Sequence, residues 1–352
     1  MSYEFLQILW FILIAVLWIG FFFLEGFDFG VGMLLPFFGK KDIERRAVIN
    51  TIGPTWDGNE VWLLTAGGAT FAAFPHWYAT MFSGFYLALF LLLVGLIIRG
   101  ISFEYRSKDA NPKWRNTFDW MIAVGSFLAA LLLGAAFANL ARGVPIDANM
   151  GVVCPDGNPC ANNLIVTFNL LNPYGLLGGL ATVAVFLVHG ANFMALKFEG
   201  ELRERASTWA WKLWMGAVVA VLLLTAGTYF YTDILTKMGV NPGITPILSL
   251  ATLLATGYFI KGKREGWAFI LLSLHIVLTQ VTFFMLMFPR VMVSSLNPAW
   301  SLTIYNASSS EYTLTVMSII ALIFVPIVLA YQGWTYWMFR KRITADKKSL
   351  VY

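Results

Sequence analysis

Long apolar stretches alternate with short polar segments along the whole chain. All but one of the stretches are near or above the roughly twenty residues that an α-helix needs to cross a bilayer. The period-two alternation that is typical of membrane barrels is absent. The pattern therefore predicts an all-α integral membrane protein, with residues 1–352 forming a single polytopic domain. We expect nine transmembrane helices, at roughly 6–36, 50–74, 77–99, 118–141, 173–196, 208–230, 245–260, 266–288 and 312–339.

The basic residues fall almost entirely on one side of this predicted topology. Alternate loops and the C-terminal tail hold 21 of the 24 Lys and Arg residues, and the opposite side holds only Arg142, Lys237 and Arg290. By the positive-inside rule, the N-terminus lies outside and the C-terminus is cytoplasmic. We expect the basic residues at 340–342 and at Lys347 and Lys348 to anchor the tail against anionic lipid.

Composition agrees with a membrane location. Hydrophobic residues make up 59% of the chain and charged residues 12%, and 30 Phe and 14 Trp need an apolar surrounding such as lipid. The net charge of +5 follows the predicted topology and does not indicate a nucleic-acid partner. Phosphate-binding, zinc-protease and dinucleotide-binding motifs are missing, which argues against an ATP-driven pump.

The longest predicted external loop, 143–168, contains both cysteines of the chain. Cys154 and Cys160 flank the turn-forming sequence Pro-Asp-Gly-Asn-Pro, on the oxidising side of the membrane. We expect a disulfide between them, with two free thiols as the alternative. A metal site is not expected, because no His or further Cys lies nearby to complete it.

Two pairs of acidic residues interrupt the apolar helices. Glu25 and Asp28 lie in the first helix, and Asp57 and Glu60 in the second, each pair three residues apart and therefore on one helix face. A carboxylate inside a bilayer costs a few kcal/mol unless it is paired, protonated or hydrated. At 1.5 Å per residue the four acids lie at graded depths from roughly 10 to 22 Å below the inner surface. Such a ladder is suited to carrying protons.

Other interpretations of the polar residues stay open. The acids could pair with Arg99 or Arg106, or remain protonated as hydrogen-bond donors. His189 and His275 lie at comparable depth on two helices, which would allow a haem with two histidine ligands, although hydrogen bonding to neighbours is commoner for such residues. The chain could then be a self-contained cytochrome b. A proton-coupled secondary transporter is a further alternative, although no inverted repeat is evident.

Several longer strings make the chain resemble subunit II of the cytochrome bd quinol oxidases, which are prokaryotic respiratory terminal oxidases. They are Glu25-Gly-Phe-Asp-Phe-Gly-Val-Gly-Met33, Glu44-Arg-Arg46, Trp56-Asp-Gly-Asn-Glu-Val-Trp-Leu-Leu-Thr-Ala-Gly-Gly-Ala69, Phe82-Ser-Gly-Phe-Tyr86, Phe103-Glu-Tyr-Arg-Ser-Lys108, Trp114-Arg-Asn116, Leu171-Asn-Pro-Tyr-Gly-Leu-Leu177, Phe288-Pro289 and Ser308-Ser-Ser310.

The resemblance implies a function that the residues alone do not. It implies a chain in the cell membrane that binds no haem itself and pairs with a subunit I that holds two b-type haems and haem d. It also implies a role in reduction of O2 by quinol, a possible structural quinone and a possible small single-helix subunit. Asp57 and Trp62 match residues of the family's proton route from the cytoplasm, whereas some relatives have Gln in place of Glu60. The proton pathway candidates are thus Asp57, Glu60, Trp62, Glu25 and Asp28.

Overall fold

The computed structural model describes residues 2–158, 160, 163–346 and 350, and most of them are helical. The elements in chain order are α1 (Tyr3–Phe38), α2 (Asp42–Ile52), α3 (Trp56–Ala73), α4 (Pro75–Gly84), α5 (Tyr86–Tyr105), η1 (Arg106–Lys108), α6 (Pro112–Arg142), α7 (Asn163–Leu170), α8 (Pro173–Lys197), α9 (Gly200–Tyr231), α10 (Thr245–Lys261), α11 (Glu265–Met287), β1 (Arg290–Met292), η2 (Pro298–Trp300), β2 (Leu302–Thr303) and α12 (Glu311–Met338).

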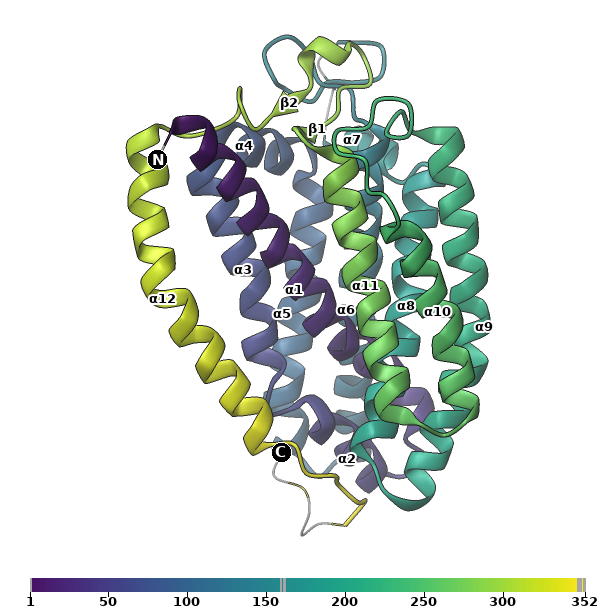
Figure 1. The fold of residues 1–352 in the computed structure, drawn as a ribbon. Coiled ribbons are helices and arrows are strands. Elements are labelled where there is room, and N and C mark those ends of the chain that lie inside the picture. The colour runs from purple at the N-terminus through teal and green to yellow at the C-terminus, as the bar shows by residue number, and fades with distance from the viewer. Residues whose placement is uncertain (1, 159, 161–162, 347–349, 351–352) are drawn as a thin grey trace.

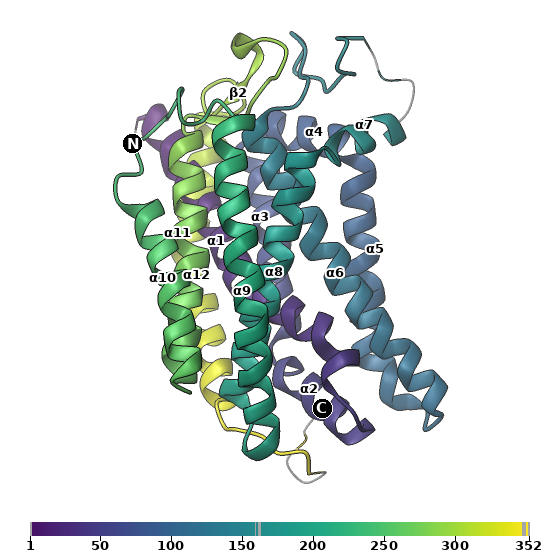
Figure 2. The ribbon, with the colours of Figure 1, turned by 90° about the vertical axis from the view of Figure 1, so that its right-hand side faces the viewer.

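The long helices run side by side in one bundle (Figure 1). The antiparallel pair β1–β2 and the loop that contains the cysteines lie at one end, and α2 and the C-terminus lie at the other (Figures 1 and 2). Helix α1 runs through the middle and packs against α3, α6, α8 and α11. Residues of α1 therefore have protein neighbours on most sides, which suits them to a polar site.

Seven of the helices in the described part of the chain are long and apolar enough to cross a membrane. They are α1, α5 with η1, α6, α8, α9, α11 and α12. Helix α10 is apolar but shorter, and α3 carries several polar residues in its first turns. Both nevertheless run along the bundle beside the longer helices (Figure 1). The chain is thus a helical integral membrane protein, while nine spans and the placement of the termini stay predictions.

Two of the predicted helices are each interrupted in the structure. The segment predicted at 50–74 is divided between α2, which ends at Ile52, and α3, which begins at Trp56. Pro54 explains this break, because it lacks the backbone N–H that would continue the helical hydrogen bonds, and its ring crowds the carbonyl group of the preceding turn. The segment predicted at 77–99 is likewise divided, with α4 ending at Gly84 and α5 beginning at Tyr86. The acids Asp57 and Glu60 consequently lie at the start of a helix rather than within one.

Helices α1 and α8 approach each other through two glycines. A Cβ atom at Gly30 would overlap the backbone carbonyl of Phe186, and one at Gly190 would overlap the backbone of Gly30. Small residues of this kind let helix backbones come into contact in membranes, where packing and hydrogen bonds drive association. This contact holds the segment of α1 that carries Glu25 and Asp28 in a fixed position.

Helix α12 is attached to the bundle at its two ends. Near its start, Trp10 Nε1 of α1 donates hydrogen bonds to the carbonyl oxygen of Leu314 (3.1 Å) and to Ser318 Oγ (3.0 Å). Leu314 is the buried residue of α12, and most of the other side chains of this helix are exposed and apolar. The helix therefore presents a wide face to lipid or to another subunit.

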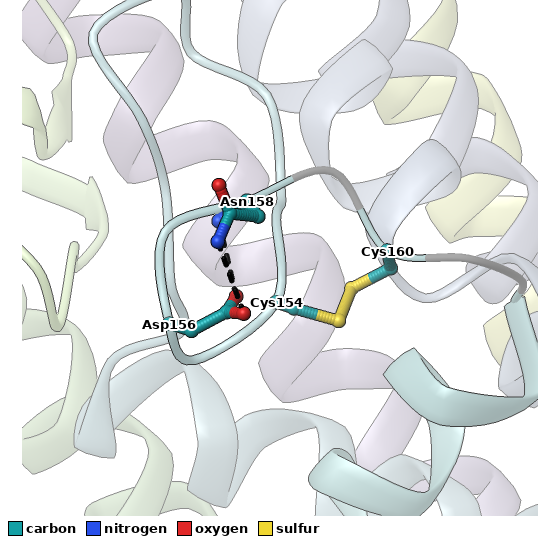
Figure 3. The surroundings of a disulfide bond; sticks show 4 residues. All are labelled: Cys154, Asp156, Asn158 and Cys160. Carbon is teal, nitrogen blue, oxygen red and sulfur yellow. Dashed lines mark hydrogen bonds between the residues drawn. A yellow bond between two sulfur atoms is a disulfide. The ribbon is translucent and has the colours of Figure 1, made fainter.

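The loop that contains the cysteines is closed by a disulfide between Cys154 and Cys160 (Figure 3). Asp156 accepts hydrogen bonds from the backbone N–H (3.0 Å) and the side-chain amide (3.1 Å) of Asn158, within the turn that the disulfide closes. Gly157 has a φ angle of 84°, in the left-handed region that favours glycine. The loop is thus shaped locally, and α7 begins within the predicted loop 143–168.

At the opposite end of the bundle, polar contacts hold the segment that follows α12. The Lys197 ammonium donates a hydrogen bond to the carbonyl oxygen of Phe339. The backbone N–H of Ile343 donates to the carbonyl oxygen of Lys197 (2.8 Å). Arg340 stacks over Trp337, with its guanidinium carbon 4.3 Å from the ring centroid. The predicted lipid anchors Lys347 and Lys348 lie outside the described residues.

Glu44 in α2 is held by an ion pair with Arg205 of α9. Its carboxylate accepts hydrogen bonds from Arg205 Nη1 (3.0 Å) and from the backbone N–H of Lys40 (2.8 Å). Burial alone would raise the pKa of this carboxyl group. The hydrogen bonds to its charged form and the charge of Arg205 outweigh burial and hold the pKa of Glu44 below its ordinary value.

We expect Gly30→Ala to destabilise the protein, because the added methyl group has no space against the backbone of α8. Overpacking of this kind costs about 1–3 kcal/mol or more. Gly216→Ala in α9 is the matched control, since no atom lies near its Cβ position. Thermal unfolding in detergent, followed by tryptophan fluorescence, should show a lower midpoint for Gly30→Ala only. Equal midpoints for the two variants would contradict the tight α1–α8 contact.

We expect the stabilising contribution of Glu44 to depend on pH. Its pKa is lower in the folded protein than the unfolded value near 4.5, so its contribution is complete above that value and is lost as the pH falls through the folded pKa. Glu44→Gln should therefore lower the unfolding temperature relative to the unchanged protein at about pH 6, and the difference should shrink toward about pH 3.5. A difference that stays constant over this range would rule out the ionised pair as its source.

Candidate functional site

The candidate site is built around Arg99, whose side chain is completely buried in α5. Its Nη1 atom lies 2.7 Å from Glu25 Oε1 of α1 and 2.9 Å from Glu60 Oε2 of α3. The Glu25 side chain is also fully buried, whereas the Glu60 side chain is 21% exposed. One positive charge thus holds two carboxylates from different helices, a pairing that the sequence had left open as an alternative.

Aromatic rings surround the Arg99 guanidinium. Its central carbon lies 4.9 Å from the ring centroid of Phe29, 5.2 Å from that of Phe103 and 5.7 Å from that of Trp56. Aromatic faces attract a cation and replace part of the hydration that it loses on burial. These rings position the guanidinium and leave the acids as its polar partners.

A second group of polar residues lies beside the first. Asn59 of α3 donates a hydrogen bond from Nδ2 to Asp28 Oδ2 (2.6 Å), and both side chains are buried. The Asn59 carbonyl oxygen accepts from Tyr336 Oη (2.7 Å) and from Gln332 Nε2 (3.2 Å), which belong to α12. Trp62 Nε1 donates to the side-chain carbonyl oxygen of Gln332 (2.9 Å). Helix α12 therefore orients the residue that holds Asp28.

Several buried polar atoms of the site have no hydrogen-bond partner among the described residues. They include one oxygen of each of two acids, Glu25 Oε2 and Asp28 Oδ1, and two nitrogens of Arg99, Nε and Nη2. A buried polar atom without a partner is costly, so the carboxylate oxygens are suited to binding a proton or water, and the arginine N–H groups are suited to binding water. The arrangement is chemically able to take up and release protons inside an apolar bundle.

Asp57 is placed differently from the other three acids. It lies in the first turn of α3 with its side chain exposed, whereas Glu25, Asp28 and Glu60 gather around Arg99 and Asn59. Asp57 and Glu60 are one helical turn apart and therefore share a face of α3. Exposure thus falls from Asp57 through Glu60 to Glu25.

Two residues of the site were not found by sequence reasoning. Tyr336 had no feature that separated it from the aromatic residues expected at the membrane interface, and Gln332 lies in a long apolar segment. The uncharged polar side chain of Gln332 within that segment was the available signal, because such groups need a partner in a bilayer. The contact with Trp62 spans 270 positions of the chain and has no local signature.

Each of the two buried histidines has polar and aromatic neighbours in the bundle. His189 Nε2 lies 3.2 Å from the carbonyl oxygen of Phe23, and its ring stacks on that of Phe269 at 4.8 Å between centroids. His275 Nδ1 lies 2.9 Å from Ser249 Oγ. His76 is exposed at the start of α4. In the described part of the chain, no three His, Cys, Asp or Glu side chains are grouped to hold a metal ion.

These features define a class of protein, a multi-pass helical membrane protein with an acid cluster inside its bundle. The profile of the family described as cytochrome bd terminal oxidase subunit II matches residues 6–339. The chain is 45% identical over 345 residues to cytochrome bd ubiquinol oxidase subunit 2 of Bacillus subtilis (strain 168), covering 98% of each chain. It is 39% identical over 375 residues to cytochrome bd-I ubiquinol oxidase subunit 2 of Escherichia coli (strain K12), covering 98% of this chain and 97% of the other.

The chain therefore belongs to the cytochrome bd terminal oxidase subunit II family. Its fold is similar to that of a chain in the bd oxidase from Geobacillus thermodenitrificans, with a TM-score of 0.74, 18% sequence identity and coverage of 95% of this chain and 98% of the other. The protein is thus a subunit of a respiratory oxidoreductase in the bacterial cytoplasmic membrane, and membership implies a subunit I as its partner.

We expect Arg99→Gln to destabilise the purified oxidase complex strongly, because Glu25 would be left buried without its counter-charge. Removing one partner of a buried ion pair costs about 3–5 kcal/mol. Adding Glu25→Gln to Arg99→Gln should recover part of this loss. The control is Arg203→Gln, which breaks the more exposed pair with Glu265 and should cost about 1 kcal/mol or less.

Yield of the complex and its thermal midpoint are the measurements for these variants. An Arg99→Gln complex as stable as the Arg203→Gln complex would show that the buried charge is not the main constraint on the site.

Proposed function

We propose that this chain is the haem-free subunit II of a quinol:O2 oxidoreductase. In this proposal it spans the membrane nine times, with the N-terminus outside and the C-terminus in the cytoplasm. It packs against a subunit I that holds two b-type haems and haem d and carries out quinol oxidation and O2 reduction. Family membership and the wide exposed apolar face of α12 support a role in binding that partner.

The observation that carries the proton-pathway part of the proposal is the group of buried acids around Arg99 and Asn59. Glu25 and Asp28 are fully buried, and each has a carboxylate oxygen with no hydrogen-bond partner among the described residues. Retaining such groups in an apolar bundle is costly and is common in proton relays. If the positions of Glu25 and Asp28 served only helix packing, apolar side chains of similar volume would stabilise the bundle at least as well.

The side chains become less exposed from Asp57 through Glu60 to Glu25, and this decrease gives the proposed proton route a direction. Protons enter at Asp57 near the inner end of α3, pass one helical turn to Glu60, and reach Glu25 across Arg99. Asp28 and Asn59 continue the polar group toward Trp62 and α12. Each step is a transfer between groups in contact or joined by water, and Arg99 keeps both glutamates oriented.

This route has an energetic consequence for the complex. Protons taken from the cytoplasm for water formation, and protons released outside by quinol, together separate charge across the membrane. The subunit would then contribute to a proton motive force without pumping.

We expect Asp57→Asn to slow quinol-dependent O2 consumption of the purified complex. An amide cannot carry a proton in place of a carboxylate, and losing a positioned proton-transfer group lowers rates by about a hundredfold or more unless water substitutes for it. Glu201→Gln is the control, because its side chain is 88% exposed at the start of α9, away from the cluster. Haem content and the ratio of the two subunits are measured on the same samples.

The outcomes separate a proton role from a structural one. Slow turnover with normal haem and subunit content supports the pathway. Loss of the partner or of haem would make the residue structural, and unchanged turnover would remove it from the pathway. Reconstituted vesicles with slowed internal alkalinisation would locate the defect in proton uptake from the inner side.

A further inference from the structure

A cleft lies between α2 and the end of α5, and it shares Phe103 with the surroundings of Arg99. It has a volume of about 200 Å³. Its lining combines apolar residues with charged and polar ones: Arg46, Ile49, Phe103, Glu104, Arg106 and Ser107. None of these residues belongs to the proposed proton route.

Arg106 is held rigidly at the cleft. Its side chain is buried, and its Nε and Nη2 atoms bond to Asp119 of α6 and, at 2.9 Å, to Asp42 of α2. Its third nitrogen, Nη1, is buried and has no hydrogen-bond partner among the described residues. Arg46 Nε is buried without a partner in the same way. Two arginines of the cleft thus retain N–H groups that could donate hydrogen bonds to an anion.

The charges around the cleft leave a positive excess. Asp119 also binds Arg45 (2.9 Å), and Asp42 also binds Arg115 (2.6 Å). Three arginines, Arg45, Arg106 and Arg115, thus share two carboxylates, and the cleft lining adds one arginine and one glutamate, so one formal positive charge is not balanced among these residues. An anion of single charge would complete the cluster.

The surroundings of the cleft match the interface between lipid and water. Tyr105 and Trp114 are exposed next to it, and Trp114 Nε1 donates to the carbonyl oxygen of Tyr105 (3.1 Å). Exposed Tyr and Trp side chains gather at the level of lipid headgroups. Ile49 and Phe103 supply the apolar wall. An anion that carries an apolar chain suits such a cleft better than a fully hydrated ion.

We propose that this cleft binds a phosphate group, with Arg46 and Arg106 donating to its oxygens and Ser107 at its rim. Arginine is suited to phosphate because its planar group presents several donors at once. The phosphate belongs either to a phospholipid, whose chain lies along Ile49 and Phe103, or to free inorganic phosphate. The ligand would join α2 to the end of α5 and to η1 at the inner end of the bundle.

The test uses the delipidated two-subunit complex and native mass spectrometry. The probes are dioctanoyl phosphatidylglycerol, dioctanoylglycerol with the same chains but no phosphate, and inorganic phosphate. We expect Arg46→Gln to weaken phosphatidylglycerol binding about tenfold, as expected for loss of one charge-assisted hydrogen bond. Ser107→Ala is a milder second variant, should Arg46→Gln fail to assemble. Lys108→Gln is the matched control, since Lys108 is a neighbouring exposed cation that does not line the cleft.

Each outcome decides the proposal. Phosphatidylglycerol binding that weakens in the cleft variants but not in Lys108→Gln, with no binding of dioctanoylglycerol, assigns the cleft to a phospholipid. Inorganic phosphate that binds alone and displaces the lipid assigns it to the free ion. Equal binding of the lipid with and without its phosphate, or equal binding by Arg46→Gln and Lys108→Gln, would overturn the proposal.

Discussion

A buried guanidinium is the constraint on which the centre of this protein depends. Arg99 sits among apolar helices where an uncompensated charge would be very costly, so α1 and α3 must each bring a carboxylate to it. The break before Trp56 starts α3 where its first turns carry Asn59 and Glu60 to the site. The glycine contact with α8 fixes α1 on the other side.

A second buried arginine, Arg106 of η1 directly after α5, organises the end of the bundle. Arg99 and Arg106 are seven residues apart, about two helical turns, so they lie on nearly the same side of the helix. The first pairs with α1 and α3, and the second with α2 and α6. Two charges, one on α5 and one on η1, thus connect four neighbouring elements, in a bilayer where apolar contacts alone give little preference for one partner over another.

The sequence predicted the helical membrane class because insertion in lipid depends on local hydropathy, which is readable in each segment. It also indicated Glu25, Asp28 and Glu60, because an acidic residue in an apolar membrane helix has a high free-energy cost and is therefore easily recognised. Pro54 is itself a local signal for the interruption between α2 and α3, but it lies within a long segment whose hydropathy predicts one continuous helix. The contacts of Asn59 with Gln332 and Tyr336, and the exposure of Asp57, depend on how distant helices pack, and no local pattern carries that information.

The attachment of α12 bears on the order in which the protein is made. Asn59 is synthesised before α12, yet the two side chains that donate to its carbonyl oxygen belong to that helix, 273 and 277 positions further along the chain. Until α12 inserts, Asn59 and Trp62 lack these partners, although Glu25, Arg99 and Glu60 can already meet. Completion of the site therefore waits for α12, and a chain truncated before this helix would leave Asn59 and Trp62 without these contacts.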